Sequence, residues 1–179
     1  MKLFDNKIRR DNTVWACDLS KERLSDSKLF NDFGNIDQKV IAAIENLPFQ
    51  DQRFDFVIGS SILHHTKNLS SFLEEVHRVL KDEGLYIGLN EPYGNKIMKR
   101  IQESRFKGFN EIVRPIRVYE EEFFQNGFDP NIKIIKKLKH QKPSSIWLYF
   151  YYAIFKFLPK LLQENLGGNI LIFSKKYKA

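Results

Sequence analysis

The sequence predicts an α/β domain with a mainly parallel sheet, and three observations lead to that prediction. Short apolar runs alternate with segments of helical periodicity along the first half of the chain. Residues 54–60 are apolar at adjacent positions, which is typical of a parallel strand covered by helices on both faces. The 179 residues, of which 42% are hydrophobic and 14% aromatic, have the size and composition of one globular domain.

The elements of the first half can be placed one by one. Four strands are expected, over residues 13–18, 39–44, 54–60 and 85–89. The first strand ends in an acid, Asp18, and Ser20 is suited to cap a helix over residues 21–30. Apolar residues at helical spacing predict a second helix over residues 69–80. Gly84 is expected to end the turn after this helix, because glycine adopts a left-handed conformation at little cost.

The second half is less regular. Helices are expected over residues 95–107, 118–125 and 146–162, and strands over residues 132–138 and 169–174. Gly127 would end the second of these helices. The third begins with ten uncharged residues rich in aromatics, which are too few to span a bilayer. We predict one domain over residues 1–179 with an aromatic helical insertion at about 144–163. Three roles are open for this insertion: a core helix or lid, a helix on a membrane surface, or a dimer face.

The net charge of +7 lies in the second half of the chain. Residues 1–90 carry 12 Lys and Arg against 14 Asp and Glu, whereas residues 91–179 carry 17 against 8. The positive charge of the second half favours an anionic partner, which would be a phosphorylated substrate, a membrane surface or nucleic acid. A solvated lysine-rich surface has the same composition. Nucleic acid is disfavoured, because the aromatic residues are contiguous and do not alternate with the basic ones.

Composition excludes several classes of protein. Cys17 is the only cysteine, so neither an internal disulfide nor a four-thiolate zinc site can form. Four histidines without paired cysteines argue against a structural metal site. The sequence has no signal-peptide core and no uncharged apolar run of about 18 residues. The expected location is therefore the cytoplasm, with peripheral membrane contact through the aromatic segment as an addition.

Four stretches carry a resemblance to a known family. They are VWACDLS at residues 14–20, ENLPFQDQRFDFV at 45–57, ILHH at 62–65 and FLEEVHRVLKDEG at 72–84. In this order and at this spacing they resemble the class I S-adenosylmethionine-dependent methyltransferases, in particular the methyltransferase type 11 domains. The resemblance implies a Rossmann-like methyltransferase sheet, mainly parallel with an antiparallel last strand. It also implies S-adenosylmethionine as cofactor.

The resemblance further implies a cofactor site at the carboxyl ends of the strands, where open α/β sheets bind nucleosides. It assigns cofactor contacts to Asp18, Leu19, Ile44, Gly59 and Ser60, and a place beside the acceptor to His65. Asp18 would bind the ribose hydroxyls, or else it only caps the following helix. His65 would act as a base or orient the acceptor near neutral pH, or else it is a packing residue.

Two departures from the family bear on activity. Family members begin with a strand and a glycine-rich loop that approaches the cofactor. Here only thirteen residues precede Val14, and none of them is glycine. Ala43 stands where the family usually has an Asp that contacts the adenine. We therefore expect a truncated sheet that lacks its first strand and, for the isolated chain, weak binding of S-adenosylmethionine.

Two classes of function remain open. The resemblance implies methyl transfer to a small-molecule or lipid-linked acceptor. The alternative is a non-catalytic remnant or binding module, whose basic and aromatic surface contacts a membrane or a protein. The aromatic face of the helix expected over residues 146–162 also leads us to expect self-association of the chain. Binding of S-adenosylmethionine or S-adenosylhomocysteine distinguishes the two classes.

Overall fold

The computed structural model describes residues 12–26, 36–94, 112–135, 157–159, 163 and 168–178. They belong to two compact units, Met1–Phe49 and Gln50–Ala179. The helix expected over residues 95–107 lies outside the described residues, as does most of the helix expected over 146–162 and of the predicted aromatic insertion. The described part of that second helix, residues 157–159, is a turn rather than a helix. None of the helices that the structure describes is long and apolar enough to cross a membrane.

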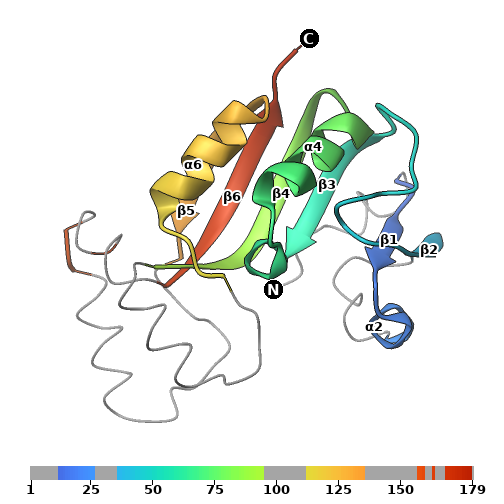
Figure 1. Ribbon diagram of the computed structural model, residues 1–179, viewed down its shortest axis with the longest axis horizontal. Helices are drawn as coiled ribbons and strands as arrows, with labels where there is room; N and C mark the ends of the chain where they lie inside the picture. Colours follow the sequence, from blue (N-terminus) through green and yellow to red (C-terminus); the bar gives the residue numbers. More distant parts are fainter. Residues whose placement is uncertain are drawn as a thin grey trace. The chain divides into compact units, whose positions relative to one another are not determined.

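The described residues of the first unit form two strands and one helix: β1 (Trp15–Asp18), α2 (Lys21–Ser25) and β2 (Gln38–Ile41) (Figure 1). The two strands pair in parallel along their whole length. Ser20 caps α2 as predicted, since its hydroxyl accepts a hydrogen bond from Arg23 N–H at 3.1 Å. Leu24 of α2 and Ala16 of β1 are the buried apolar residues in the described part of this unit.

The second unit holds most of the described structure. In chain order it contains β3 (Phe54–Ser60), the 3-10 turn η1 (Leu63–His65), α4 (Leu69–Val79), β4 (Leu80–Tyr93), α6 (Ile116–Gln125), β5 (Phe128–Ile134) and β6 (Gly168–Lys176). The four strands are ordered β3-β4-β6-β5 (Figure 1). β3 and β4 are parallel, while β6 is antiparallel to both of its neighbours.

This topology confirms the predicted fold class, an α/β sheet with parallel pairs and an antiparallel last strand. Among the described strands, β3 forms one edge of the four-stranded sheet. The expected lack of a first strand would be tested by residues 1–11, which lie outside the described part of the chain.

The turn between α4 and β4 differs from the prediction. β4 starts directly after the helix, at Leu80, and the left-handed residue is Glu83 (φ 61°) rather than Gly84. Gly84 is needed for close packing instead, because a Cβ there would lie 2.8 Å from the Lys81 carbonyl oxygen. Gly127 does have the expected conformation, with a φ of 83° directly after α6. That turn leads straight into β5, which therefore begins earlier than predicted.

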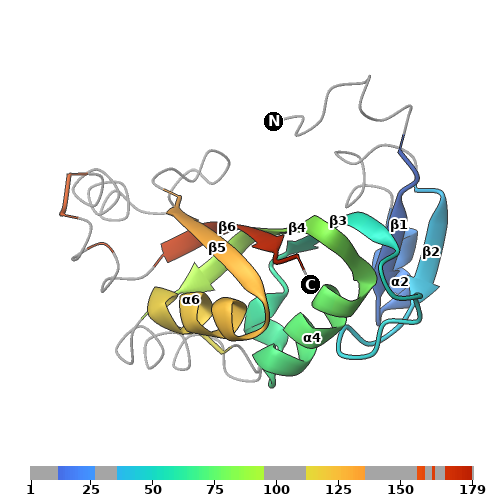
Figure 2. The same cartoon turned by 90° about the horizontal axis from the view of Figure 1, so that it is seen from above.

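One face of the four-stranded sheet packs against α4 and α6, and we call it the covered face (Figure 2). Tyr86, Ile172 and Phe128 on this face have no exposed area. The Tyr86 ring lies 6.0 Å from Phe72 of α4 and 5.4 Å from Phe123 of α6, measured between ring centroids. Since burial of each such side chain stabilises the fold by about 1.5–3 kcal/mol, the core of the second unit lies in this layer.

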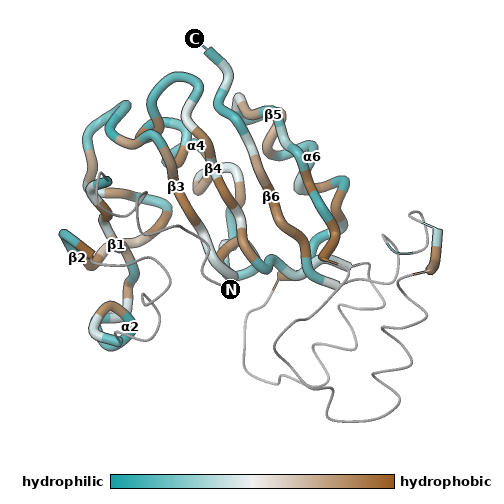
Figure 3. Tube along the Cα trace, turned by 180° about the vertical axis from the view of Figure 1, so that it is seen from behind, coloured by the Kyte–Doolittle hydropathy of each residue, from teal (hydrophilic) through white to brown (hydrophobic). Residues whose placement is uncertain are grey.

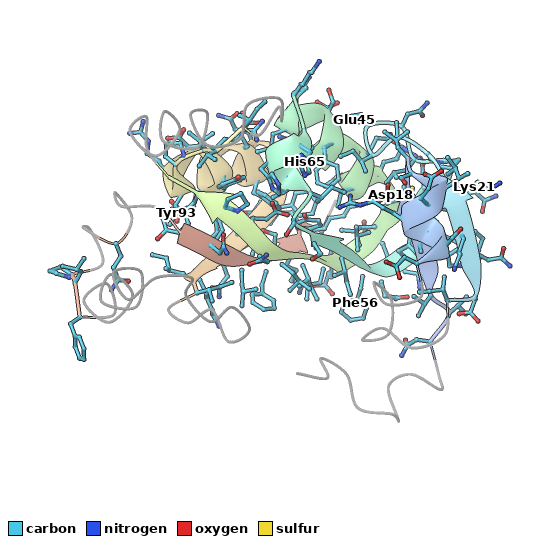
Figure 4. The ribbon with its side chains drawn as sticks, turned by 90° about the horizontal axis from the view of Figure 1, so that it is seen from below. Asp18, Lys21, Glu45, Phe56, His65 and Tyr93 are labelled. Atoms are coloured by element: carbon cyan, nitrogen blue, oxygen red, sulfur yellow. The ribbon has the colours of Figure 1, made fainter. Side chains whose placement is uncertain are left out.

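Hydrophobic residues are frequent along β3, β4 and β6 (Figure 3), and some of them lie on the opposite face, which we call the open face. Strand pairing places on it Phe56, Ile58, Leu85, Ile87 and Phe173. Phe56 is 57% exposed, and Figure 4 shows it on the side of the sheet away from α4 and α6. The prediction that residues 54–60 are covered on both faces is therefore wrong for the part of the molecule that the structure describes.

Candidate functional site

A group of polar residues lies at the carboxyl ends of the parallel strands β3 and β4. Ser61 Oγ donates to Asn90 O at 3.2 Å, and the Asn90 amide donates to Ser61 Oγ at 3.2 Å. Asn169, near the start of β6, donates to Asn90 Oδ1 at 2.9 Å. Ser61 and Asn90 both have a positive φ (53° and 56°), a strained conformation that recurs at ligand-binding sites. Open α/β sheets bind ligands at this end of their strands.

The turn η1, which follows β3, places two adjacent histidines in different environments. His64 is buried, whereas His65 is exposed, and their ring centroids are 4.0 Å apart. His64 is therefore a packing residue, while both roles predicted for His65 stay open. A residue that exchanges a proton with an acceptor has to be accessible, and His65 meets this requirement (Figure 4).

Glu91, near the end of β4, holds this turn from the interior and has no exposed area. Its Oε1 accepts from Ile62 N–H at 2.7 Å, and its Oε2 accepts from Leu63 N–H at 3.1 Å. Oε2 also lies 3.2 Å from His64 Nδ1. A buried carboxylate is tolerated only when it is hydrogen-bonded, and these three contacts meet that need.

Arg114, two residues before α6, holds the carbonyl groups of the same turn. Its Nη1 donates to Leu63 O at 3.0 Å, and its Nη2 donates to Thr66 O at 2.7 Å. Ile112 N–H donates to His64 O at 2.8 Å. The planar guanidinium suits two carbonyl acceptors at a fixed separation. The backbone of residues 62–66 is thus held from two sides. Its N–H groups bind Glu91 of β4, and its carbonyl groups bind the segment before α6.

Gly59 and Ser60, two of the predicted cofactor contacts, form the end of β3. Ser60 is exposed, whereas Gly59 is buried, and a Cβ on Gly59 would lie 2.6 Å from the Tyr86 hydroxyl oxygen. That hydroxyl is fully buried and has no hydrogen-bond partner among the described residues. Burial and then the charge of Glu91 raise the pKa of Tyr86 well above its usual value. Packing beneath the turn is therefore a sufficient reason for glycine at position 59.

The remaining predicted cofactor contacts belong to the first unit and are Asp18, Leu19 and Ile44. Asp18 Oδ1 accepts from Ser20 N–H at 2.8 Å, while Oδ2 lies 3.7 Å from Arg23 Nη1. Asp18 thus orients the residue that caps α2 and is not itself the cap. Leu19 is 68% exposed, and Ile44 is half-buried in the turn after β2.

Sequence reasoning missed Glu91 and Arg114. A signal for Glu91 was present just past the predicted strand 85–89, since an acid between Leu89 and Tyr93 has to find a partner if the strand continues, as β4 does. Arg114 stands in a segment without helical or strand periodicity, so the sequence offers no comparable signal. Within the described ranges, no three His, Cys, Asp or Glu side chains gather as the ligands of a metal ion would.

Together, the strand order and the polar strand ends define the Rossmann-like fold of class I methyltransferases. A putative methyltransferase of Haloferax volcanii, solved with the Trm112 activator, shares this fold with a TM-score of 0.69 and 15% identity, over 97% of this chain and 76% of that one. Geranyl diphosphate C-methyltransferase of Streptomyces coelicolor was solved with Mg²⁺, geranyl diphosphate and S-adenosylhomocysteine. It shares the fold with a TM-score of 0.66 and 14% identity, over 95% of this chain and 65% of that one. At these identities the likeness shows the fold alone.

Residues 2–88 match the family model described as "Methyltransferase domain". The chain is 35% identical over 75 residues to the mouse mitochondrial arginine-hydroxylase NDUFAF5. These 75 residues are 42% of this chain and 21% of that protein. It is 30% identical over 115 residues to the ubiquinone/menaquinone biosynthesis C-methyltransferase UbiE of Rickettsia felis. The aligned region is 61% of this chain and 43% of that one. The chain therefore spans less than half the length of these two relatives. The matched segment and the fold together support the predicted resemblance to the class I methyltransferases.

Proposed function

We propose that this chain is a methyltransferase domain that binds the adenosine part of S-adenosylmethionine at the carboxyl end of β1. The observation that carries the proposal is the pair Asp18 and Leu19, which ends a parallel strand inside the segment that matches the family. Asp18 Oδ2 has only a long contact with Arg23, at 3.7 Å, so it can accept a hydrogen bond from a ribose hydroxyl. Exposed Leu19 offers an apolar surface to one side of an adenine ring.

The residues present fit the adenosine end of this cofactor better than its methionine end. Asp18 and Leu19 suit a ribose and an adenine ring, whereas Ala43 brings no polar group to the adenine amine. At the methionine end Ser60 is exposed. Residues 1–14 of this chain contain no glycine whose backbone could approach the methionine end closely. The loss of several hydrogen bonds at about 0.5–1.5 kcal/mol each leads us to expect a dissociation constant weaker than micromolar for the isolated chain.

The proposed reaction is methyl transfer to a small-molecule or lipid-linked acceptor. When bound, the cofactor supplies a sulfonium methyl group for an oxygen, nitrogen or carbon nucleophile. His65, exposed on η1, would orient this acceptor or take up its proton near neutral pH. Two relatives support this class of acceptor, since UbiE acts in ubiquinone and menaquinone biosynthesis and the Streptomyces enzyme methylates geranyl diphosphate.

Partners and location follow from the charge of the chain. The excess of Lys and Arg in residues 91–179 supports a phosphorylated acceptor or peripheral contact with an anionic membrane from the cytoplasm. The Haloferax methyltransferase was solved in complex with an activator protein, which supports a protein partner here as well. Self-association through exposed apolar residues is the other partnership that we propose.

The test is calorimetric titration of the 179-residue chain with S-adenosylhomocysteine. Asp18→Asn keeps an acceptor for Ser20 N–H but removes the charge, and it should weaken binding by about tenfold or more. Glu45→Gln is the matched control, because Glu45 is an exposed acid of the same unit, and it should bind like the unchanged chain. Equal affinities for the Asp18 variant and the control would contradict the proposed ribose contact.

A second candidate is a non-catalytic binding module, and the open face of the sheet favours it. An apolar face with Phe56 57% exposed is suited to contact a protein or a membrane. If the chain is folded and takes up no S-adenosylhomocysteine even at millimolar concentration, this candidate replaces the first. Binding of S-adenosylhomocysteine that depends on Asp18 would support the methyltransferase domain.

A further inference from the structure

We propose that Glu91 is a positioning residue, which acts through the turn η1 to hold His65 at the carboxyl ends of β3 and β4. The inference rests on the proposed function, because it assigns a support to the side chain that faces the acceptor. Glu91 itself cannot meet an acceptor, since it has no exposed area. Its effect has to pass through the groups that it binds.

The first step is the backbone of the turn. Glu91 accepts hydrogen bonds from two consecutive backbone N–H groups, those of Ile62 and Leu63, with a different oxygen for each. The preceding residue, Ser61, is held at a φ of 53°, which is unfavourable for a residue with a side chain. Removal of the carboxylate would leave two donors of a largely buried turn without a partner, and the strained residue before them would lose its support.

The second step is the ring of His64. Its Nδ1 lies 3.2 Å from Glu91 Oε2. Because a carboxylate only accepts hydrogen bonds, we assign the proton of the ring to Nδ1. This contact fixes both the orientation and the tautomer of the buried ring. The ring in turn lies 4.0 Å from that of His65, centroid to centroid. Glu91 is thereby connected to the exposed imidazole through one intervening side chain.

Arg114 provides an internal comparison. It binds Leu63 O and Thr66 O and so fixes the backbone of the same turn, but the described contacts do not join it to either histidine ring. A change at Arg114 should loosen the backbone alone. A change at Glu91 should loosen the backbone and also alter the His64 ring, and this difference separates positioning from a general structural role.

The experiment compares Glu91→Gln and Glu91→Asp with the control Glu83→Gln, an exposed acid on the same strand that pairs with Lys175. Nitrogen-15 spectra report the His64 ring, and amide hydrogen exchange reports Ile62 and Leu63. In the Gln variant we expect the Nδ1 resonance to shift and both amides to exchange about tenfold faster or more. The Asp variant keeps the charge and should restore part of both signals. Unchanged signals in a folded Glu91→Gln protein would overturn the proposal.

Two further measurements keep the outcome clear. If Glu91→Gln does not fold, the unaltered chain still decides, because a His64 ring without a proton on Nδ1 contradicts the proposed contact. Titration with S-adenosylhomocysteine of the unaltered chain tests the proposed function separately from these spectra. Once an acceptor is in hand, Glu91→Gln should lower kcat and leave the affinity for S-adenosylhomocysteine within about twofold, because the described hydrogen bonds of Glu91 go to Ile62, Leu63 and His64 and to none of the predicted cofactor contacts. An equal loss of affinity and rate would indicate general unfolding and count against positioning.

Discussion

On the covered face of the four-stranded sheet, Tyr86 and Ile172 have no exposed area, whereas on the open face Phe56 keeps more than half of its surface in contact with solvent. Both faces belong to the same strands and carry the same kinds of side chain. They differ in what packs on them, since α4 and α6 lie on one face only within the described residues (Figure 2). Apolar alternation therefore predicts which positions can be buried, and neighbouring elements decide which of them are.

The comparison also separates two kinds of apolar residue by what they contribute. A side chain on the covered face stabilises the fold through burial and through ring contacts with both helices. A side chain on the open face contributes little to the folded chain alone, and it marks a surface for interaction or aggregation. Substitutions at matched positions can test this distinction directly.

The largest expected effect is at Phe123, which has no exposed area and whose ring packs between Tyr86 and Phe128. Phe123→Ala should lower the free energy of unfolding by about 3–5 kcal/mol, because it leaves a cavity in the covered layer. Its neighbour Phe124 is 64% exposed, and Phe124→Ala should change stability by about 1 kcal/mol or less. Urea unfolding of both variants measures the difference, and similar losses would contradict the comparison.

The next effect concerns Lys176, a buried lysine at the end of β6. Its ammonium group donates to His77 O and Leu80 O, both at 2.9 Å, at the carboxyl end of α4. Lys176→Met should destabilise the chain by about 1–3 kcal/mol, since two carbonyl groups lose a charged donor. Lys175→Met is the control, because Lys175 is exposed and its ion pair among the described residues is with Glu83 at the surface. Equal unfolding midpoints for the two variants would refute this assignment.

A smaller effect on stability, but a clear effect on association, is expected on the open face. Phe56→Ser combined with Ile58→Ser should change the free energy of unfolding by about 1 kcal/mol or less, because both side chains are exposed. The same change should reduce self-association and binding to vesicles, measured by size-exclusion chromatography and co-sedimentation. A strong loss of stability without any change in association would mean that this face is part of the core.

The smallest effect is a pH dependence from His77. Burial, and then the charge of Lys176, lower the pKa of His77 below its usual 6.5. Between the two pKa values the unfolded chain binds more protons than the folded one, so the free energy of unfolding rises with pH in this range. The contribution of neutral His77 to the free energy of unfolding is present above pH 6.5 and is lost as the pH falls through the lowered pKa of the folded state. Unfolding midpoints on either side of pH 6.5 should therefore differ less in His77→Gln than in the unaltered chain.

Much of the fold could be predicted because local signals and packing agree. Residues 54–60 were placed as β3 without error, and the Ser20 cap and the Gly127 turn were found from residue type alone. The start of β4 could not be predicted, because Glu83 rather than the adjacent glycine takes the left-handed conformation there. That choice depends on the close approach of the Lys81 carbonyl to Gly84, which is a tertiary contact.

The candidate site was predictable only in part. The sequence pointed to the two histidines of η1, but it could not tell which of them is buried, since the answer depends on Glu91 from another strand. It also could not anticipate that Gly59 makes room for the Tyr86 hydroxyl. Residues that bind at strand ends can be located from motifs, whereas the residues that support them are defined by the packing of segments distant in sequence.

The position of β6 has a consequence for how the chain is made. β6 is synthesised after β5, yet it lies between β4 and β5 and hydrogen-bonds to both. From the end of β5 at Ile134 to the start of β6 at Gly168, translation at about 5–20 residues per second takes roughly 2–7 seconds. Throughout that interval β4 and β5 have no strand between them, and their edges can pair with other chains. Ribosome pausing in this stretch, or a shortage of chaperones, would therefore reduce the yield of folded protein more than the same disturbance elsewhere.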